Sequence, residues 1–150
     1  MFDDLRDLYQ EVILDHGRRP RHGTRLAGFD ATAKGDNPMC GDRVQVFVRH
    51  DADGRIAETG FEARGCAISI ASADLMAEAV AGRTNDEVRA LAATFANMTR
   101  TGAAPGDDEA MARLRALAGV HEFPSRIKCA TLAWHALLAA LDGKGDASSE

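Results

Sequence analysis

The sequence predicts an α+β fold in which helices pack on a three-stranded antiparallel sheet. Between residues 26 and 65 the apolar residues tend to alternate, most clearly at Val44, Val46 and Val48, and this period of two is typical of strands. After Cys66 the apolar residues recur at helical spacing as far as Leu141. A run of strands followed by a run of helices favours the α+β class over alternating βαβ units.

The first half of the chain divides into one helix and three strands. Residues 3–16 carry apolar residues at helical spacing, and Gly17 ends this helix. Residues 26–33 form a weak strand candidate, and the stretch around 44–48 forms a strong one. Asp51–Gly54 supplies a turn, and residues 55–65 return as the third strand.

Local stop and start signals divide the second half into helices. The helix after Cys66 is closed by Gly82, and Thr84 with Glu87 forms a capping box for the next one. A third helix lies around residues 111–117, and the last begins near Ser125, a suitable N-cap. Residues 143–150 are polar, and we expect them to fray. We expect residues 1–150 to form a single domain.

Composition excludes several classes of function. The net charge of −5 gives no broad basic field of the kind that binds nucleic acid. The longest apolar stretch, residues 132–141, is too short to cross a bilayer, and the acidic N-terminus lacks the apolar core of a secretory signal. We therefore expect no nucleic-acid or membrane partner and a cytoplasmic location, where thiols stay reduced.

Three widely spaced cysteines are the most informative residues: Cys40, Cys66 and Cys129. Together with Asp42 they offer three sulfur ligands and one oxygen, which is a complete tetrahedral set for zinc. An odd number of thiols cannot be used up by disulfides within one chain. Spacing alone leaves open the alternative that they are three unrelated buried cysteines.

Each thiol is predicted to lie at the boundary of an element, where distant segments can meet. Cys40 falls in the loop between the first two strands, and an extended backbone there points Asp42 to the same side. Cys66 lies where the third strand passes into a helix. Cys129 is expected in the first turn of the last helix, where unpaired N–H groups stabilise a thiolate.

Basic residues accompany the thiols in the sequence. Three thiolates and a carboxylate carry four negative charges, of which Zn²⁺ cancels two. Arg64, Arg126 and Lys128 could offset the remainder. A solvated surface charge is the simpler interpretation of Arg64 and Lys128, whereas a functional role is favoured for Arg126. The histidines show no ligand spacing to a thiol, so we expect surface or packing roles for them, with His16 a modest exception.

Several motifs make the chain resemble a known family. The segments NPMCGD, GCAISIASADLM and RIKCATLAWHAL, with LYQEVILDHGRRPRHG near the N-terminus, resemble the iron–sulfur cluster assembly proteins of the IscU/NifU-like family. The resemblance runs in order from Leu8 to Leu141. Lys128 stands where IscU-type proteins have histidine, and residues 84–121 form an extra stretch, so the chain is most similar to the SufU branch.

This resemblance implies an IscU/SufE-like fold with helices on one side of a small sheet. It implies a zinc-dependent sulfurtransferase of the SUF system, which accepts persulfide sulfur from a SufS-type cysteine desulfurase and passes it towards a downstream cluster-assembly scaffold. The implied zinc ligands are Cys40, Asp42, Cys66 and Cys129. The resemblance also assigns two catalytic roles: Cys40 as the sulfur acceptor and Arg126 as a residue that helps to dock the partner or open the site.

Two other functions fit the same residues. One is a scaffold on which a transient [2Fe–2S] cluster is assembled, because the same ligands could hold iron. The other is a zinc-stabilised adaptor without enzymatic activity. Structural zinc sites usually include close pairs such as C-x₂-C, which this chain lacks, so the sequence favours a functional thiolate over the adaptor.

Overall fold

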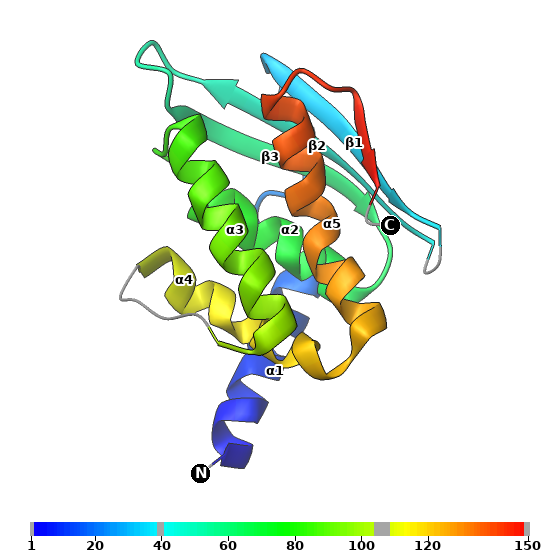
Figure 1. Ribbon diagram of the computed structural model, residues 1–150. Coiled ribbons are helices and arrows are strands. Elements are labelled where there is room, and N and C mark those ends of the chain that lie inside the picture. The colour runs from blue at the N-terminus through cyan, green and yellow to red at the C-terminus, as the bar shows by residue number, and fades with distance from the viewer. Residues whose placement is uncertain (1, 39–40, 104–108, 149–150) are drawn as a thin grey trace.

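The computed structural model describes residues 2–38, 41–103 and 109–148 and confirms the α+β class. Helices lie on one face of a twisted sheet (Figure 1). The strands described are β1 (Ala31–Asn37), β2 (Asp42–His50), β3 (Ile56–Arg64) and β4 (Asp146–Ser148), in the spatial order β3-β2-β1-β4.

The prediction of three antiparallel strands is wrong in one respect, because the sheet has four strands and is mixed. β1, β2 and β3 pair antiparallel, whereas β4 pairs parallel with β1. β4 comes from the tail that was expected to fray. It covers the edge of β1, and the Lys34 N–H donates to the Gly145 carbonyl at 3.0 Å just before it. An uncovered edge would expose a row of unpaired backbone groups, which explains why a short polar segment is ordered here.

β1 begins later than the predicted strand at residues 26–33. The residues before it run along the outer face of the sheet instead, where Leu26 is buried and packs over Gly60 of β3. Arg25 lies over the rings of Phe29 and Phe47 at 5.4 and 5.2 Å. This segment covers the side of β2 that the helices do not reach.

The helices match their predicted positions closely. They are α1 (Phe2–Arg18), α2 (Ala67–Ala79), α3 (Asn85–Thr101), α4 (Glu109–Leu114) and α5 (Pro124–Leu141), with a 3₁₀ segment, η1 (Arg115–Glu122), between the last two. The Thr84 hydroxyl accepts a hydrogen bond from the Glu87 N–H at 3.2 Å, as the capping box predicts. α5 begins earlier than predicted: Phe123 is its N-cap and Pro124 opens its first turn.

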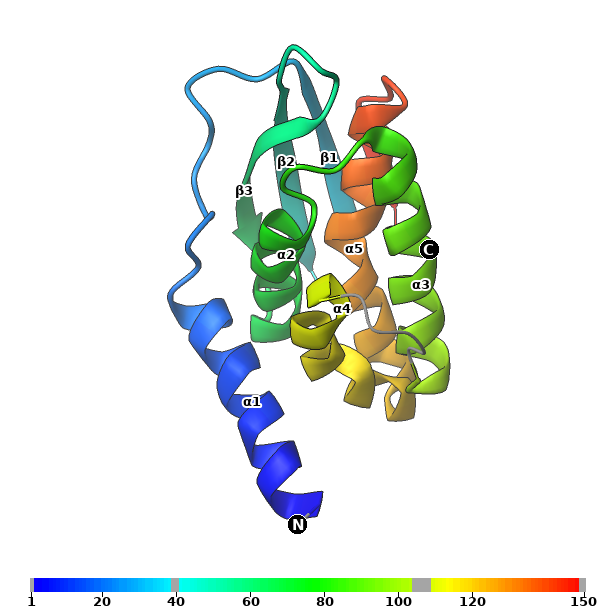
Figure 2. The ribbon, with the colours of Figure 1, turned by 90° about the vertical axis from the view of Figure 1, so that its left-hand side faces the viewer.

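The core lies between the sheet and the helices, and it fixes α2 beside α5. Phe95 of α3 stacks on Trp134 of α5 with ring centroids 4.6 Å apart. The Ser72 hydroxyl of α2 donates to the Ala130 carbonyl of α5 at 2.5 Å. α1 projects past the end of the sheet (Figure 2). Within the described part of the chain, no helix combines the length and the apolarity needed to cross a membrane.

Candidate metal centre

Three of the four predicted ligands come together from three separate elements. Asp42 is the first residue of β2, Cys66 is the N-cap of α2, and Cys129 lies in α5. Their ligand atoms lie within 4.8 Å of one another. The fourth predicted ligand, Cys40, lies outside the described residues.

Asp42 is held in place by the backbone that leads into α2. Its side chain is buried, and its Oδ1 accepts a hydrogen bond from the Cys66 N–H at 3.0 Å. Its Oδ2 lies 3.9 Å from the Cys66 sulfur. Gly65 makes this approach possible, because a Cβ at that position would lie 2.8 Å from Asp42 Cγ. One carboxylate oxygen is thus used for positioning, and the other faces the sulfur.

Cys129 is fully buried, and its thiol donates to the Ser125 carbonyl at 3.6 Å. Because α5 begins at Pro124, Cys129 lies in the second turn, so the predicted stabilisation by unpaired N–H groups of the first turn is wrong for this residue. Burial raises the pKa of the Cys129 thiol, and the hydrogen bond with Asp42 and the charge of Cys66 raise it further. A thiolate at this position therefore depends on a nearby cation.

The donor set fits a tetrahedral zinc ion. Zinc bonds of about 2.3 Å to sulfur and about 2.1 Å to oxygen place ligand atoms roughly 3.6 Å apart. The observed separation of 3.9 Å between Asp42 Oδ2 and the Cys66 sulfur is close to that value. Two sulfurs and one oxygen would contribute three of the four ligands of such an ion.

The basic residues beside the thiols differ in exposure. Arg64 ends β3 and Arg126 lies in the first turn of α5, both exposed, whereas Lys128 is half-buried. Their proposed electrostatic role, and the role of Arg126 in docking or opening the site, stay predictions.

A second group of possible ligands lies where α1, α2 and α4 meet. The ligand atoms of His16, Asp74 and Glu78 are within 4.8 Å of one another. Arg113 donates to His16 Nε2 at 3.0 Å, so Nδ1 carries the proton that His16 donates to Asp74 at 2.5 Å. Arg113 also pairs with Glu78 at 3.3 Å. Because these groups already satisfy one another, the cluster ties helices together. His16, which sequence analysis set apart from the other histidines, therefore has a packing role as well.

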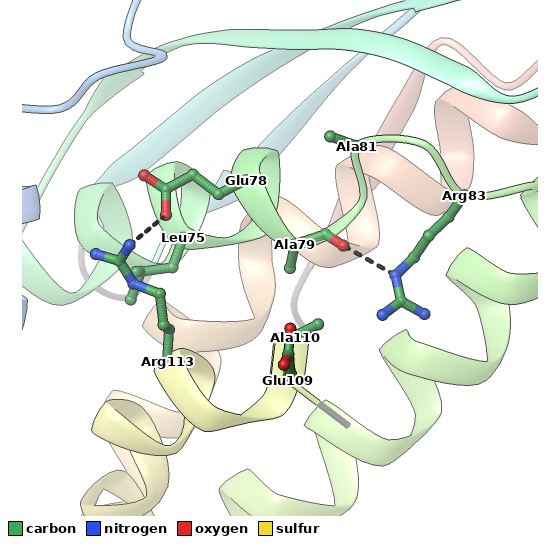
Figure 3. A pocket seen from close by; sticks show the side chains of 8 residues that line it. All are labelled: Leu75, Glu78, Ala79, Ala81, Arg83, Glu109, Ala110 and Arg113. Atoms are coloured by element: carbon green, nitrogen blue, oxygen red, sulfur yellow. Dashed lines mark hydrogen bonds and ion pairs between the residues drawn. The ribbon is translucent and has the colours of Figure 1, made fainter. Parts of the chain in front are cut away.

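A cavity of about 500 Å³ lies beside this cluster, between the end of α2 and the start of α4. Figure 3 shows the Glu78–Arg113 ion pair on its wall and the bond from Arg83 to the Ala79 carbonyl. None of the residues that line it is a cysteine. The cavity is therefore separate from the sulfur and carboxylate group.

Two residues beside the metal centre were not singled out from the sequence. Gly65 provides space for Asp42, and Asn37 is completely buried opposite Asp42 in the sheet. Their only signal was their place next to the motif residues. A third residue that was not singled out, Asp74, does carry a signal in the sequence. It is a charged residue inside an apolar helix, which indicates a buried partner.

Comparison with known proteins identifies the family. Residues 8–141 match the model of the NifU-like N terminal domain. The chain belongs to this family. This result confirms the resemblance drawn from the cysteine motifs, and the matched range is the one over which those motifs were found in order.

Relatives within the NifU-like family carry two different functional names. An iron–sulfur cluster assembly scaffold protein IscU of Streptococcus pyogenes is 41% identical over 143 residues, which are 95% of this chain and 88% of the relative. A zinc-dependent sulfurtransferase SufU of Bacillus subtilis is 37% identical over 134 residues, 89% of each chain. A solved structure from Fervidobacterium islandicum, titled as a putative iron–sulfur cluster assembly scaffold protein for the SUF system, superposes with a TM-score of 0.79 at 29% identity, over 87% of this chain and 94% of that one.

Proposed function

We propose that this protein is a zinc-dependent sulfurtransferase of the SufU type, which accepts sulfur from a cysteine desulfurase for iron–sulfur cluster assembly. The observation that carries the proposal is the meeting of Asp42, Cys66 and Cys129 at the end of the sheet where β1 turns into β2. The sulfurtransferase name of the Bacillus subtilis relative supports it.

Asp42, Cys66 and Cys129, with Cys40 as the fourth ligand, would hold Zn²⁺. The ion would supply the positive charge that keeps these thiols deprotonated at neutral pH. The chain itself holds Asp42 through the Cys66 N–H and keeps Cys129 away from water. Arg126, exposed at the start of α5, would face an approaching partner.

In the transfer step, the Cys40 thiolate attacks the outer sulfur of the persulfide on the desulfurase. A sulfur–sulfur bond forms at Cys40 while the one on the partner breaks, and the partner cysteine leaves as a thiolate. The exchange is balanced and needs no other oxidant or reductant. Its rate depends on the fraction of attacking thiolate and on how well the partner cysteine leaves.

The test is Cys40→Ser, with alanine release by a SufS-type desulfurase as the readout. We expect the variant to keep the far-UV circular dichroism of the wild type but to leave desulfurase turnover at the level of the desulfurase alone. Mass spectrometry should find the extra sulfur atom on the wild type only. A Cys40→Ser protein that still stimulates turnover and gains sulfur would overturn the assignment of the acceptor.

A cluster scaffold is the second candidate, and the name of the 41% identical relative favours it. Anaerobic reconstitution with iron and sulfide separates the two. A sulfurtransferase should keep its zinc and stimulate the desulfurase, whereas a scaffold should exchange its metal for a cluster that absorbs visible light.

A further inference from the structure

Asn37 ends β1 with a carboxamide that is buried and unpartnered. Its exposure is 0%, and neither Oδ1 nor Nδ2 has a hydrogen-bond partner among the residues that the structure describes. Its backbone carbonyl is satisfied, since it accepts from the Gly41 N–H at 2.9 Å. Folded proteins rarely leave a whole buried amide unpaired, and an unpaired group of this kind often indicates a missing ion or ligand.

The register of the sheet places this amide beside the metal centre. Asn37 is directly opposite Asp42, and paired residues point to the same face with Cβ atoms about 4.5–5.5 Å apart. Gly35 lies on the same face of β1, and a Cβ there would touch Leu132 and Ala136 of α5. Asn37 follows Gly35 towards the end of the strand, and Cys129 precedes Leu132 by three residues on α5. Asn37 therefore lies between two elements that each carry a proposed ligand.

We propose that Asn37 is a positioning residue whose Nδ2–H donates a hydrogen bond to a metal-bound thiolate of the centre. The inference rests on the proposed zinc site. Three thiolates and one carboxylate leave a net charge of −2 around Zn²⁺, and buried sulfur lone pairs are stabilised by N–H donors. An amide supplies such a donor without adding a charge or a fifth ligand. Groups that bond to metal ligands in this way tune the affinity of the site.

The test compares Asn37→Leu with a matched control, Thr59→Val. Thr59 is also buried with an unpartnered side-chain oxygen, but it pairs with Val48, away from Asp42. Each substitution replaces an unsatisfied polar group with an apolar one of similar size, so neither should destabilise the metal-free protein in urea. Only Asn37→Leu should weaken zinc binding, by about 10–100-fold in a chelator competition.

Cobalt substitution gives a spectroscopic band that would not change if Asn37 only stabilised the fold. Loss of an N–H···S bond raises the energy of the sulfur lone pairs, so the sulfur-to-cobalt charge-transfer band of Asn37→Leu should shift to lower energy. The band of Thr59→Val should match the wild type. Asn37→Ala, which removes the donor without any risk of overpacking, should behave like Asn37→Leu.

The outcomes separate this inference from the proposed function. Wild-type zinc affinity and an unshifted cobalt band in both Asn37 variants would overturn the role of Asn37 and leave the zinc site standing. Failure of the wild type itself to bind zinc or cobalt would overturn both.

Discussion

At the scale of single residues, Gly65 decides whether Asp42 can lie where the metal centre needs it. Its φ of +153° is a conformation that side chains rarely adopt. A Cβ at this position would overlap the Asp42 carboxylate, which accepts the Cys66 N–H. The glycine before the second cysteine is thus tied to the geometry of the site and not only to the path of the chain.

We predict that Gly65→Ala weakens zinc binding by about 10–100-fold, because the displaced carboxylate no longer accepts the Cys66 N–H or faces the sulfur. The loss of a buried hydrogen bond should also cost about 1–3 kcal/mol of unfolding free energy. Chelator competition and urea unfolding measure the two effects.

Gly82→Ala is the control for Gly65→Ala. Gly82 also has a positive φ, +78°, but a Cβ there meets no atom within 4 Å. It should cost only the strain of the left-handed backbone, about 1–2 kcal/mol, and leave zinc affinity unchanged. Equal zinc affinities in the two variants would show that the contact with Asp42 has no role in binding.

The residues that sequence analysis identified are those whose chemistry is unusual in itself. Three thiols and a nearby carboxylate are a possible metal ligand set, and the structure brings together Asp42, Cys66 and Cys129, the members of that set that it describes. Asn37 and Gly65 are common residue types, one at the end of β1 and the other directly after β3. Their importance depends on the register that pairs Asn37 with Asp42 and on the distance from Gly65 to the Asp42 carboxylate. Neither the register nor the distance can be predicted from the sequence alone.

At the scale of elements, α1 is attached to the body through a buried polar contact. His16 donates to Asp74 of α2, which also accepts from the His22 N–H at 2.8 Å, and Arg113 of α4 donates to the other side of the imidazole. One carboxylate thus serves both the end of α1 and the segment that follows it.

We predict that Asp74→Ala lowers the free energy of unfolding by about 1–3 kcal/mol for each donor that loses its acceptor, the His16 ring N–H and the His22 N–H. The exposed pair of Asp15 with Arg21, 2.6 Å apart, provides the control. Asp15→Ala should cost less than about 1 kcal/mol, since water replaces its partner. Urea unfolding of both variants measures the difference, and similar losses would mean that the Asp74 cluster does not fasten α1.

Elements were predictable where their signals are local. The Thr84 capping box lies within one turn of the boundary that it sets, the start of α3. Pro124 outweighed Ser125 at the start of α5, because proline suits the first helical turn. β4 has no comparable signal. It exists because the edge of β1, more than a hundred residues earlier, offers unpaired backbone groups.

At the scale of the whole molecule, the metal centre lies at the margin of the hydrophobic core. The core lies between the sheet and α2, α3 and α5 and includes Phe61, Leu75 and Phe95. The metal centre lies at one end, where β1 turns into β2 and where α2 begins. Structural zinc sites contribute about 10 kcal/mol or more, which is comparable with the total stability of a domain.

Although such a contribution is large, the sheet and helices have a core of their own. We predict that removing zinc from the loaded protein lowers its melting temperature but does not unfold it. Far-UV circular dichroism should stay close to that of the loaded protein, because the core needs no metal. Hydrogen exchange should quicken around residues 41–42, 64–66 and 125–129, where burial of negative charge is no longer compensated. Exchange in α3, which carries none of the predicted ligands, should hardly change.

Returning zinc should restore slow exchange in these three segments, whereas Mg²⁺ should not, because it prefers oxygen ligands over thiolates. Collapse of the circular dichroism on chelation would mean that the metal holds the fold together, as it does in small zinc domains whose cores are too small to fold alone. That result would contradict the prediction that the core around Phe61 and Phe95 is stable without the metal.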